Sequence, residues 1–142
     1  MGAMTTTLNP YLNFRGMARD AMTFYQSVLG GELTVSSFDE FGAPVGEGEG
    51  NLVMHSQLGT PAGFLLMASD VPSHMDYTRG VNDSSVSLSG DDEAELTGYW
   101  QKLTDGATVS QPLEKAPWGD SFGMLTDKFG IVWLVNISAP AA

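Results

Sequence analysis

Apolar residues recur with two different periods along the chain, and each period predicts a type of element. The stretch MARDAMTFYQSVLGG (17–31) has apolar residues at helical spacing, which predicts an amphipathic helix ended by Gly30 and Gly31. A short extended segment, NPYLNFRG (9–16), precedes this helix, and three strands are predicted after it. The apolar stripe of the helix comprises Met17, Ala21, Phe24 and Val28. The three strands are predicted at 32–38, 51–58 and 63–69.

The same order of elements returns in the second half of the chain. SSVSLSG (84–90) alternates serines with Val86 and Leu88, which predicts a strand with one apolar face. Asp92 stands where it can cap a following helix, with Glu95 three positions later as in a capping box. This helix has the apolar face Leu96, Tyr99, Trp100 and Leu103 and ends by Gly106. Three more strands are predicted at 107–113, 120–127 and 131–137.

Both halves therefore have the order strand–helix–strand–strand–strand, related by an offset of 75 residues that places Gly31 on Gly106 and Tyr25 on Trp100. One helix for every four strands, repeated once, predicts an α+β fold of two βαβββ modules. The helices should cover one face of curved mixed sheets, and the opposite faces should enclose a cleft.

We expect these modules to form a single domain at 8–138, since domains commonly have this size. The start of the chain resembles a cloning remnant, and its end a frayed tail. The predicted divisions are a tag or disordered N-terminus at 1–7, module one at 8–70, a connector at 71–82, module two at 83–138 and a tail at 139–142.

The composition is acidic, and it narrows the classes of partner. The chain has 17 Asp and Glu against 6 Lys and Arg, for a net charge of −11. It lacks the surplus of basic side chains that nucleic acids and anionic membranes attract, so neither partner is predicted. With no cysteine, disulfides and thiolate sites are excluded. This, together with the lack of a long apolar run or a signal-peptide core, predicts a cytoplasmic protein.

Two segments, PYLNFRGMARDAMTFYQSVLGGEL (10–33) and WGDSFGMLTDKFG (118–130), together with the order of the modules, resemble the vicinal oxygen chelate superfamily. That superfamily covers glyoxalase I, bleomycin- and fosfomycin-resistance proteins and extradiol dioxygenases. More closely, the segments resemble its PhnB-like branch, often labelled 3-demethylubiquinone-9 3-methyltransferase-like. The resemblance implies the glyoxalase/bleomycin resistance/dihydroxybiphenyl dioxygenase fold and a homodimer. A methyltransferase is not supported, because no Gly-rich strand-to-helix turn for a nucleotide cofactor is present.

The resemblance also implies where a divalent metal would be held, namely by four His, Glu or Gln side chains on the cleft faces. The corresponding positions here are Pro10, Ser85, Leu134 and a position in the strand 63–69. None of these offers a good ligand, since proline and leucine have no donor atom and a lone serine is a weak one. We therefore predict no metal site and no cofactor.

His55 is the strongest candidate for chemistry. By strand alternation it shares a face with Val53 and Gln57, and an imidazole lining a cleft could serve as an acid–base or as a hydrogen-bond partner. The alternative is a strand histidine satisfied by a neighbouring backbone or carboxylate group. His74, in the connector, is expected to be a surface residue.

Serines and one tryptophan are the remaining candidates for ligand contact. Ser85, Ser87 and Ser89 should face the cleft, where they could bind a polar ligand or simply face water. Trp118 stands at a loop-to-strand boundary and could wall the cleft or pack at a subunit contact, with Asp120 beside it as a polar anchor or a turn residue.

The hairpin after Asp120 has a structural interpretation. Asp127 and Gly130 predict a tight turn, with the carboxylate capping it and the glycine supplying a positive φ. Trp133 alternates with Leu134, which places the indole on the helix side, in the core.

The sequence thus favours a metal-independent protein that binds a small aromatic or amphiphilic molecule in the cleft. The alternative is a glyoxalase-like lyase or isomerase, or a dioxygenase-related enzyme, that uses His55 and a non-standard or substrate-assisted metal site. A third possibility is a structural or regulatory partner, which would have a filled cleft. The predicted lining comprises Leu12, Phe14, His55, Ser85, Ser87, Ser89 and Trp118.

Overall fold

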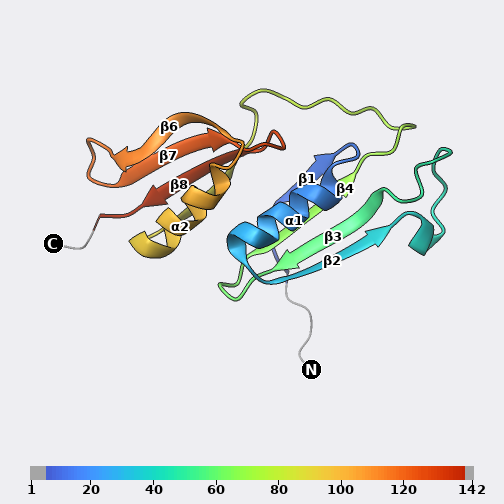
Figure 1. Cartoon of the computed structure of the whole chain (residues 1–142), viewed down its shortest axis with the longest axis horizontal. Helices are drawn as coiled ribbons and strands as arrows, with labels where there is room; N and C mark the ends of the chain where they lie inside the picture. Colours follow the sequence, from blue (N-terminus) through green and yellow to red (C-terminus); the bar gives the residue numbers. More distant parts are fainter. Residues whose placement is uncertain (1–5, 140–142) are drawn as a thin grey trace. The chain divides into compact units, whose positions relative to one another are not determined.

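The computed structural model describes residues 6–139, and each half of the chain folds as the predicted βαβββ module (Figure 1). The chain divides into two compact units between Tyr77 and Thr78, inside the predicted connector. Most of the predicted N-terminal tag and of the tail, residues 1–5 and 140–142, lies outside the described residues.

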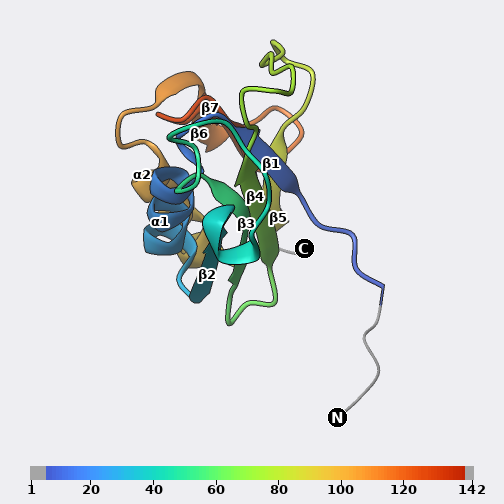
Figure 2. The ribbon, with the colours of Figure 1, turned by 90° about the vertical axis from the view of Figure 1, so that its right-hand side faces the viewer.

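The first unit is a four-stranded mixed sheet with one helix against it. The strand order is β1-β4-β3-β2, with β1 parallel to β4 and the other pairs antiparallel. Figure 2 shows α1 on one side of this sheet. Where an irregular loop follows β2, the chain first makes a short 3-10 turn. The elements are β1 (Tyr11–Phe14), α1 (Ala18–Leu29), β2 (Glu32–Ser37), η1 (Asp39–Phe41), β3 (Val53–Gly59) and β4 (Leu65–Asp70).

The second unit repeats this arrangement. Its strand order is β5-β8-β7-β6, and β5 is the strand parallel to its neighbour β8. The elements are β5 (Val86–Gly90), α2 (Glu93–Leu103), β6 (Thr108–Lys115), β7 (Ser121–Thr126) and β8 (Val132–Ile137). The α+β fold of two βαβββ modules with mixed sheets is therefore confirmed.

Asp70, the last residue of β4, shows which side of the first sheet faces α1. Its Oδ1 accepts hydrogen bonds from the N–H groups of Gly16 (2.8 Å) and Ala18 (3.0 Å) at the start of the helix. Ala68 and Leu66, whose side chains lie on the same side of β4 as that of Asp70, are buried. We call this side of a sheet its helix face, and the side not covered by the unit's own helix its open face.

The buried stripe of α1 is rotated relative to the predicted one. Ala21 and Val28 are buried as expected, but Met17 precedes the helix and is exposed, and Phe24 is half-buried. The reason is that helical spacing alone does not choose between neighbouring stripes, because the predicted and the buried stripe both alternate three- and four-residue steps. The buried residues are Ala18, Ala21, Met22, Tyr25, Val28 and Leu29.

In the second unit, Trp100 of α2 packs directly on the sheet at Gly123 of β7. A Cβ built on Gly123 would lie 2.8 Å from the indole ring, so only glycine leaves room for this contact. Leu125 and Trp133 are buried on the same face. Asp92 caps α2 as predicted, with Oδ1 accepting the Glu95 N–H at 3.0 Å, but the Glu95 carboxylate instead accepts the hydroxyl of Tyr99.

Neither helix of the described chain is long and apolar enough to cross a membrane.

Candidate functional site

The open face of the first unit brings Tyr11 and His55 together across β4. The Tyr11 hydroxyl lies 3.4 Å from His55 Nδ1, and the two ring centroids are 5.9 Å apart. The imidazole tautomer decides which of the two atoms donates. Ladder partners place Met67, Gln57 and Ser36 on the same face, since Tyr11 and Gln57 both pair with Met67 and His55 pairs with Ser36.

This pair can form hydrogen bonds with a bound molecule and can move a proton. A hydroxyl and an imidazole within reach of each other are a common acid–base arrangement, and both also serve as donors or acceptors in ligand binding. His55 is partly accessible and Tyr11 is 45% exposed, so the pair is reachable from its surroundings. The sequence identified His55 but missed Tyr11, which lies 44 residues away in the chain.

Leu12 and Phe14, predicted to line the cleft, lie on the helix face of β1. Leu12 pairs with buried Ala68 and Phe14 with Asp70, and Phe14 is only 1% exposed. This part of the predicted lining is wrong, because the apolar pair of β1 packs toward α1. Tyr11 and Asn13, in the opposite phase, occupy the open face instead.

A β-bulge changes the neighbours that were predicted for His55. Ser36 pairs with His55 but Ser37 pairs with Val53, so β3 has one extra residue, Met54, at this point. The bulge moves Val53 into phase with buried Ser56 rather than with His55. Gln57 shares the face of His55 as predicted, whereas Val53 does not.

The serine row of the second unit lies on its open face. Ser87 pairs with Leu134 and Ser89 with Asn136, while Leu88 pairs with buried Val135 on the helix face. Ser85 directly precedes the strand and is exposed. On β7, Phe122 and Met124 complete the face, since they pair with Asn136 and Leu134. The open face thus mixes hydroxyl and amide groups with apolar side chains.

Trp118 lies in a turn beside this face and is 66% exposed. The turn is closed by hydrogen bonds from Gly119 N to Ala116 O and from Ala116 N to Asp120 O. The indole centroid lies 6.2 Å from the ring of Phe122, so an aromatic pair stands at this end of β7. Its high exposure leaves the indole available for contact with another molecule.

Asp120 anchors the chain next to Trp118, which accords with both interpretations of this residue. Its Oδ1 accepts the Ala139 N–H at 2.9 Å and its Oδ2 accepts the Asn136 side-chain amide at 3.2 Å. These two hydrogen bonds lower the pKa of the Asp120 carboxyl, the bond from Ala139 contributing most. Asp120 therefore orders the C-terminal end of β8 and orients Asn136 on the open face.

The turn between β7 and β8 confirms the structural interpretation of the hairpin. Asp127 is 4% exposed and its carboxylate accepts the N–H groups of Phe129 and Ile131 and the indole N–H of Trp133, at 2.8 to 3.0 Å. Gly130 has φ +91°. Trp133 is 1% exposed and belongs to the core, as predicted.

His74 is exposed, as expected for the connector. It stands beside a local network in which the Glu49 carboxylate accepts hydrogen bonds from the Ser73 hydroxyl, the Ser73 N–H and the Gly46 N–H. The Ser73 hydroxyl is the main cause of a lowered Glu49 pKa. The network ties the glycine-rich loop after η1 to the connector.

The donor atoms around the predicted last ligand position do not fit a divalent metal. Leu134, the residue at the predicted last ligand position, faces Ser87 and Met124, which offer a hydroxyl and a thioether rather than a carboxylate or imidazole. Among residues 6–139, no three His, Cys, Asp or Glu side chains are placed to hold an ion.

Comparison with known proteins identifies the family. Residues 7–135 match the family model of the Glyoxalase/Bleomycin resistance protein/Dioxygenase superfamily. Protein YjdN of Escherichia coli strain K12 is 26% identical over 141 residues, which span 92% of this chain and 94% of YjdN.

Two solved structures share the fold over nearly their whole length. Protein PA1353 from Pseudomonas aeruginosa is 34% identical with a TM-score of 0.80, covering 96% of this chain and 100% of that one. The PhnB protein from Bacillus cereus, described as a putative 3-demethylubiquinone-9 3-methyltransferase, is 25% identical with a TM-score of 0.73, covering 94% and 100%. The chain belongs to the glyoxalase/bleomycin resistance protein/dioxygenase superfamily, within its PhnB-like branch.

Proposed function

We propose that this chain binds a small aromatic or amphiphilic molecule on the open faces of its sheets, without a metal held by the protein. The Tyr11–His55 pair is the observation that carries this proposal. It places two hydrogen-bonding groups beside the thioether of Met67 on a partly accessible surface. Small-molecule sites commonly combine a few placed polar groups with apolar surroundings in this way.

The second unit supports the proposal with an open face of similar character. Leu134 and Met124 supply apolar contact, while Ser87 and Asn136 supply hydrogen-bonding groups. Trp118 adds an exposed indole, whose flat ring can stack on an aromatic ligand. Methionine side chains adapt to ligands of different shape, so this face suits a range of related molecules.

A ligand screen with matched variants tests the proposal. We expect a compound from a panel of antibiotics and aromatic metabolites to raise the melting temperature and to bind by calorimetry. His55→Ala should weaken the binding of that compound. His74→Ala, which removes the chain's other histidine from the exposed connector, should leave the binding unchanged. Loss of one hydrogen-bonding partner costs about 0.5–1.5 kcal/mol, which is roughly a 2- to 12-fold change in affinity. A panel without any binder would contradict the proposal.

An enzyme of the lyase or isomerase class is the second candidate, and the Tyr11 hydroxyl favours it by giving His55 a polar partner at 3.4 Å. In such an enzyme His55 would accept or deliver a proton and Tyr11 would orient the imidazole. Turnover of a bound compound, lost in His55→Ala and reduced in Tyr11→Phe, would establish this function in place of simple binding.

The homodimer and the cytoplasmic location stay predictions. Sedimentation at several protein concentrations measures the first, and we expect a species of twice the 15.1 kDa chain mass. Fractionation of the source cells measures the second.

A further inference from the structure

We infer that the open faces select an uncharged or cationic ligand and exclude anions such as carboxylates and phosphonates. This inference rests on the proposed function and concerns the charge of the ligand. Proteins hold anions chiefly with Arg and Lys side chains and with the N–H groups at helix N-termini. Both kinds of group are present in this chain, and none of them stands at an open-face strand position.

In the first unit, both arginines donate to backbone carbonyls that lie outside the strands. Arg15, in the turn after β1, donates from Nε to Val71 O at 3.2 Å and from Nη2 to the carbonyls of Pro72 and Met75. Its guanidinium also lies over the Tyr77 ring, 5.3 Å from the centroid. Arg19 projects from α1 and donates to Asn51 O at 3.4 Å.

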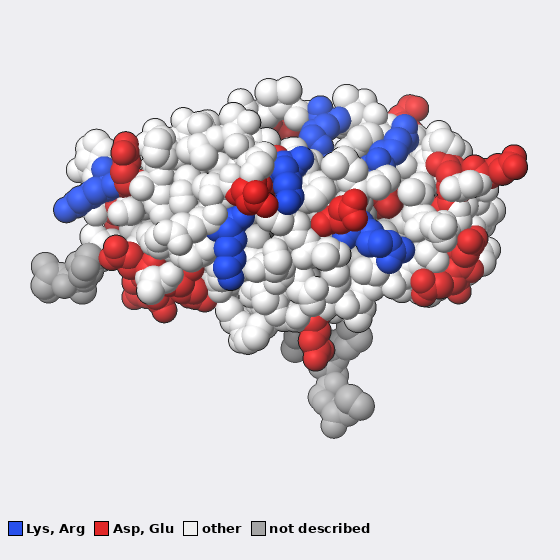
Figure 3. All heavy atoms as spheres, viewed as in Figure 1, with Lys and Arg blue, Asp and Glu red and all other residues white. Residues whose placement is uncertain are grey.

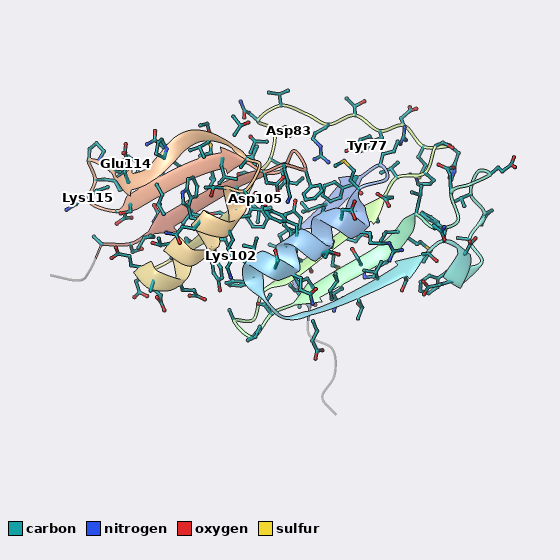
Figure 4. The ribbon with its side chains drawn as sticks, viewed as in Figure 1. Tyr77, Asp83, Lys102, Asp105, Glu114 and Lys115 are labelled. Carbon is teal, nitrogen blue, oxygen red and sulfur yellow. The ribbon has the colours of Figure 1, made fainter. Side chains whose placement is uncertain are left out.

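In the second unit, the four remaining basic residues likewise avoid open-face positions. Lys128 forms an ion pair with Asp105 at 3.3 Å, and Lys102 stands in the last turn of α2. Lys115 pairs with Ser121, whose side chain belongs to the helix face of β7 by alternation. Figure 4 shows Lys115 at the C-terminal end of β6. Arg79 lies in the segment before β5, with its side chain near Gly130.

The helix N-termini are occupied by the chain's own carboxylates. Asp70 Oδ1 accepts two N–H groups at the start of α1, and Asp92 Oδ1 accepts the Glu95 N–H at the start of α2. At the N-terminus of either helix, an anionic ligand would find a carboxylate already bound to the N–H groups that it would need. Neither terminus therefore offers an anion site.

The charges that do stand on open-face positions are negative. Glu32 pairs with Gly59 at one end of the first sheet, in phase with His55, and Glu114 pairs with Phe122 in the second. The chain as a whole is acidic, with a net charge of −11, and the view in Figure 3 shows carboxylates together with basic side chains on the surface. An anion on these faces would lose hydration without gaining an Arg or Lys partner, whereas a cation would gain favourable electrostatic interactions.

Three probes that share one aromatic ring and differ in charge test this inference: naphthylmethylammonium, naphthylmethanol and naphthoate. Proton–nitrogen correlation NMR of the full chain reports weak binding and locates it. We expect the ammonium and the alcohol to shift the resonances of Tyr11, His55 or the Trp118 indole, and naphthoate to bind about tenfold more weakly or not at all. Raising NaCl from about 10 to about 150 mM shortens the Debye length from about 30 to about 8 Å. This should weaken the binding of the ammonium probe and leave the binding of the alcohol unchanged.

Matched variants distinguish the effect of an open-face carboxylate from the effect of the overall charge. Glu114→Gln should reduce the affinity for naphthylmethylammonium more than Glu93→Gln, which removes the same charge from the first turn of α2. Equal losses would overturn the inference, since the selectivity would then come from net charge alone. Naphthoate binding as tightly as the alcohol would also overturn it, while leaving the proposed function intact. Failure of all three probes would contradict the proposed function itself.

Discussion

At the scale of single residues, two buried aspartates fix parts of the backbone whose geometry the strand and helix patterns do not predict. Asp70 and Asp127 are each 4% exposed, and each accepts three hydrogen bonds from N–H groups of other residues. A carboxylate satisfied in this way fixes the geometry around it, because every buried polar group needs a partner. Asp70 joins β3 and β4 to the start of α1, and Asp127 joins the β7–β8 turn to the core indole.

We predict that Asp127→Asn destabilises the chain. The asparagine oxygen can still accept the N–H groups of Phe129 and Ile131, but its amide NH₂ then faces the indole N–H of Trp133, and two donors meet without an acceptor. The expected loss in free energy of unfolding is about 1–3 kcal/mol, measured by urea denaturation. Asp91→Asn, at an exposed position, should change it by less than about 0.5 kcal/mol. Equal stabilities of the two variants would contradict the role of Asp127.

We also predict that the Tyr99 hydroxyl loses its proton at a higher pH than an ordinary tyrosine does. Burial and the hydrogen bond from its hydroxyl to Glu95 Oε2 (2.6 Å) raise its pKa to about 12 from the ordinary 10.0. Because the folded pKa lies above the unfolded one, this group's stabilisation is complete below about pH 10 and is lost as the pH rises toward 12.

Tyrosinate absorbance measures this titration. The difference between the parent chain and Tyr99→Phe isolates the residue, and Glu95→Gln should lower its pKa by removing the carboxylate. Titration of Tyr99 at its ordinary pKa would contradict the structural assignment.

At the scale of elements, the hydrophobic pattern predicted both α-helices and all eight strands of the described residues, but neither the 3-10 turn η1 nor every phase. The serines of β5 were placed on the correct face because Val86 and Leu88 are its apolar positions. The same rule, applied to β1, would have placed Leu12 and Phe14 inward and found Tyr11 on the open face.

Other features depend on tertiary contacts that local patterns do not contain. The bulge at Met54 resets the alternation of β3, and neither residue next to it, Val53 or His55, is a glycine or typical turn residue that would mark it. The first helix has no capping side chain of its own, since its cap is Asp70, about 50 residues later in the chain. Only the assembled sheet brings these groups together.

A pair of glycine substitutions tests the packing of α2 on its sheet. Gly123→Ala should destabilise the chain by about 1–3 kcal/mol, because the new Cβ would lie 2.8 Å from the Trp100 ring and 2.9 Å from Leu113 Cα. Gly98→Ala, within α2 and with no atom near its Cβ position, should stabilise by about 0.5–1 kcal/mol. Thermal unfolding measures both, and stabilisation by Gly123→Ala would contradict the described contact.

At the scale of the whole molecule, the repeated βαβββ order predicted the fold, because each module carries its own helix and sheet pattern, and the resemblance of segments 10–33 and 118–130 indicated the family. The site was less predictable. His55 could be found from its residue type, but its partner Tyr11 depends on the parallel pairing of β1 with β4. The scaffold is that of a family with metal enzymes, while the side chains at the corresponding positions are poor metal ligands.

The metal content of the purified chain tests this central claim most directly. The protein would be prepared without chelator from cells grown with added zinc, nickel, manganese and iron, and analysed by elemental mass spectrometry. We expect each metal to be far below one equivalent per chain, and ligand binding to be the same with and without EDTA. One equivalent of a divalent metal, lost together with ligand binding in EDTA, would contradict the account.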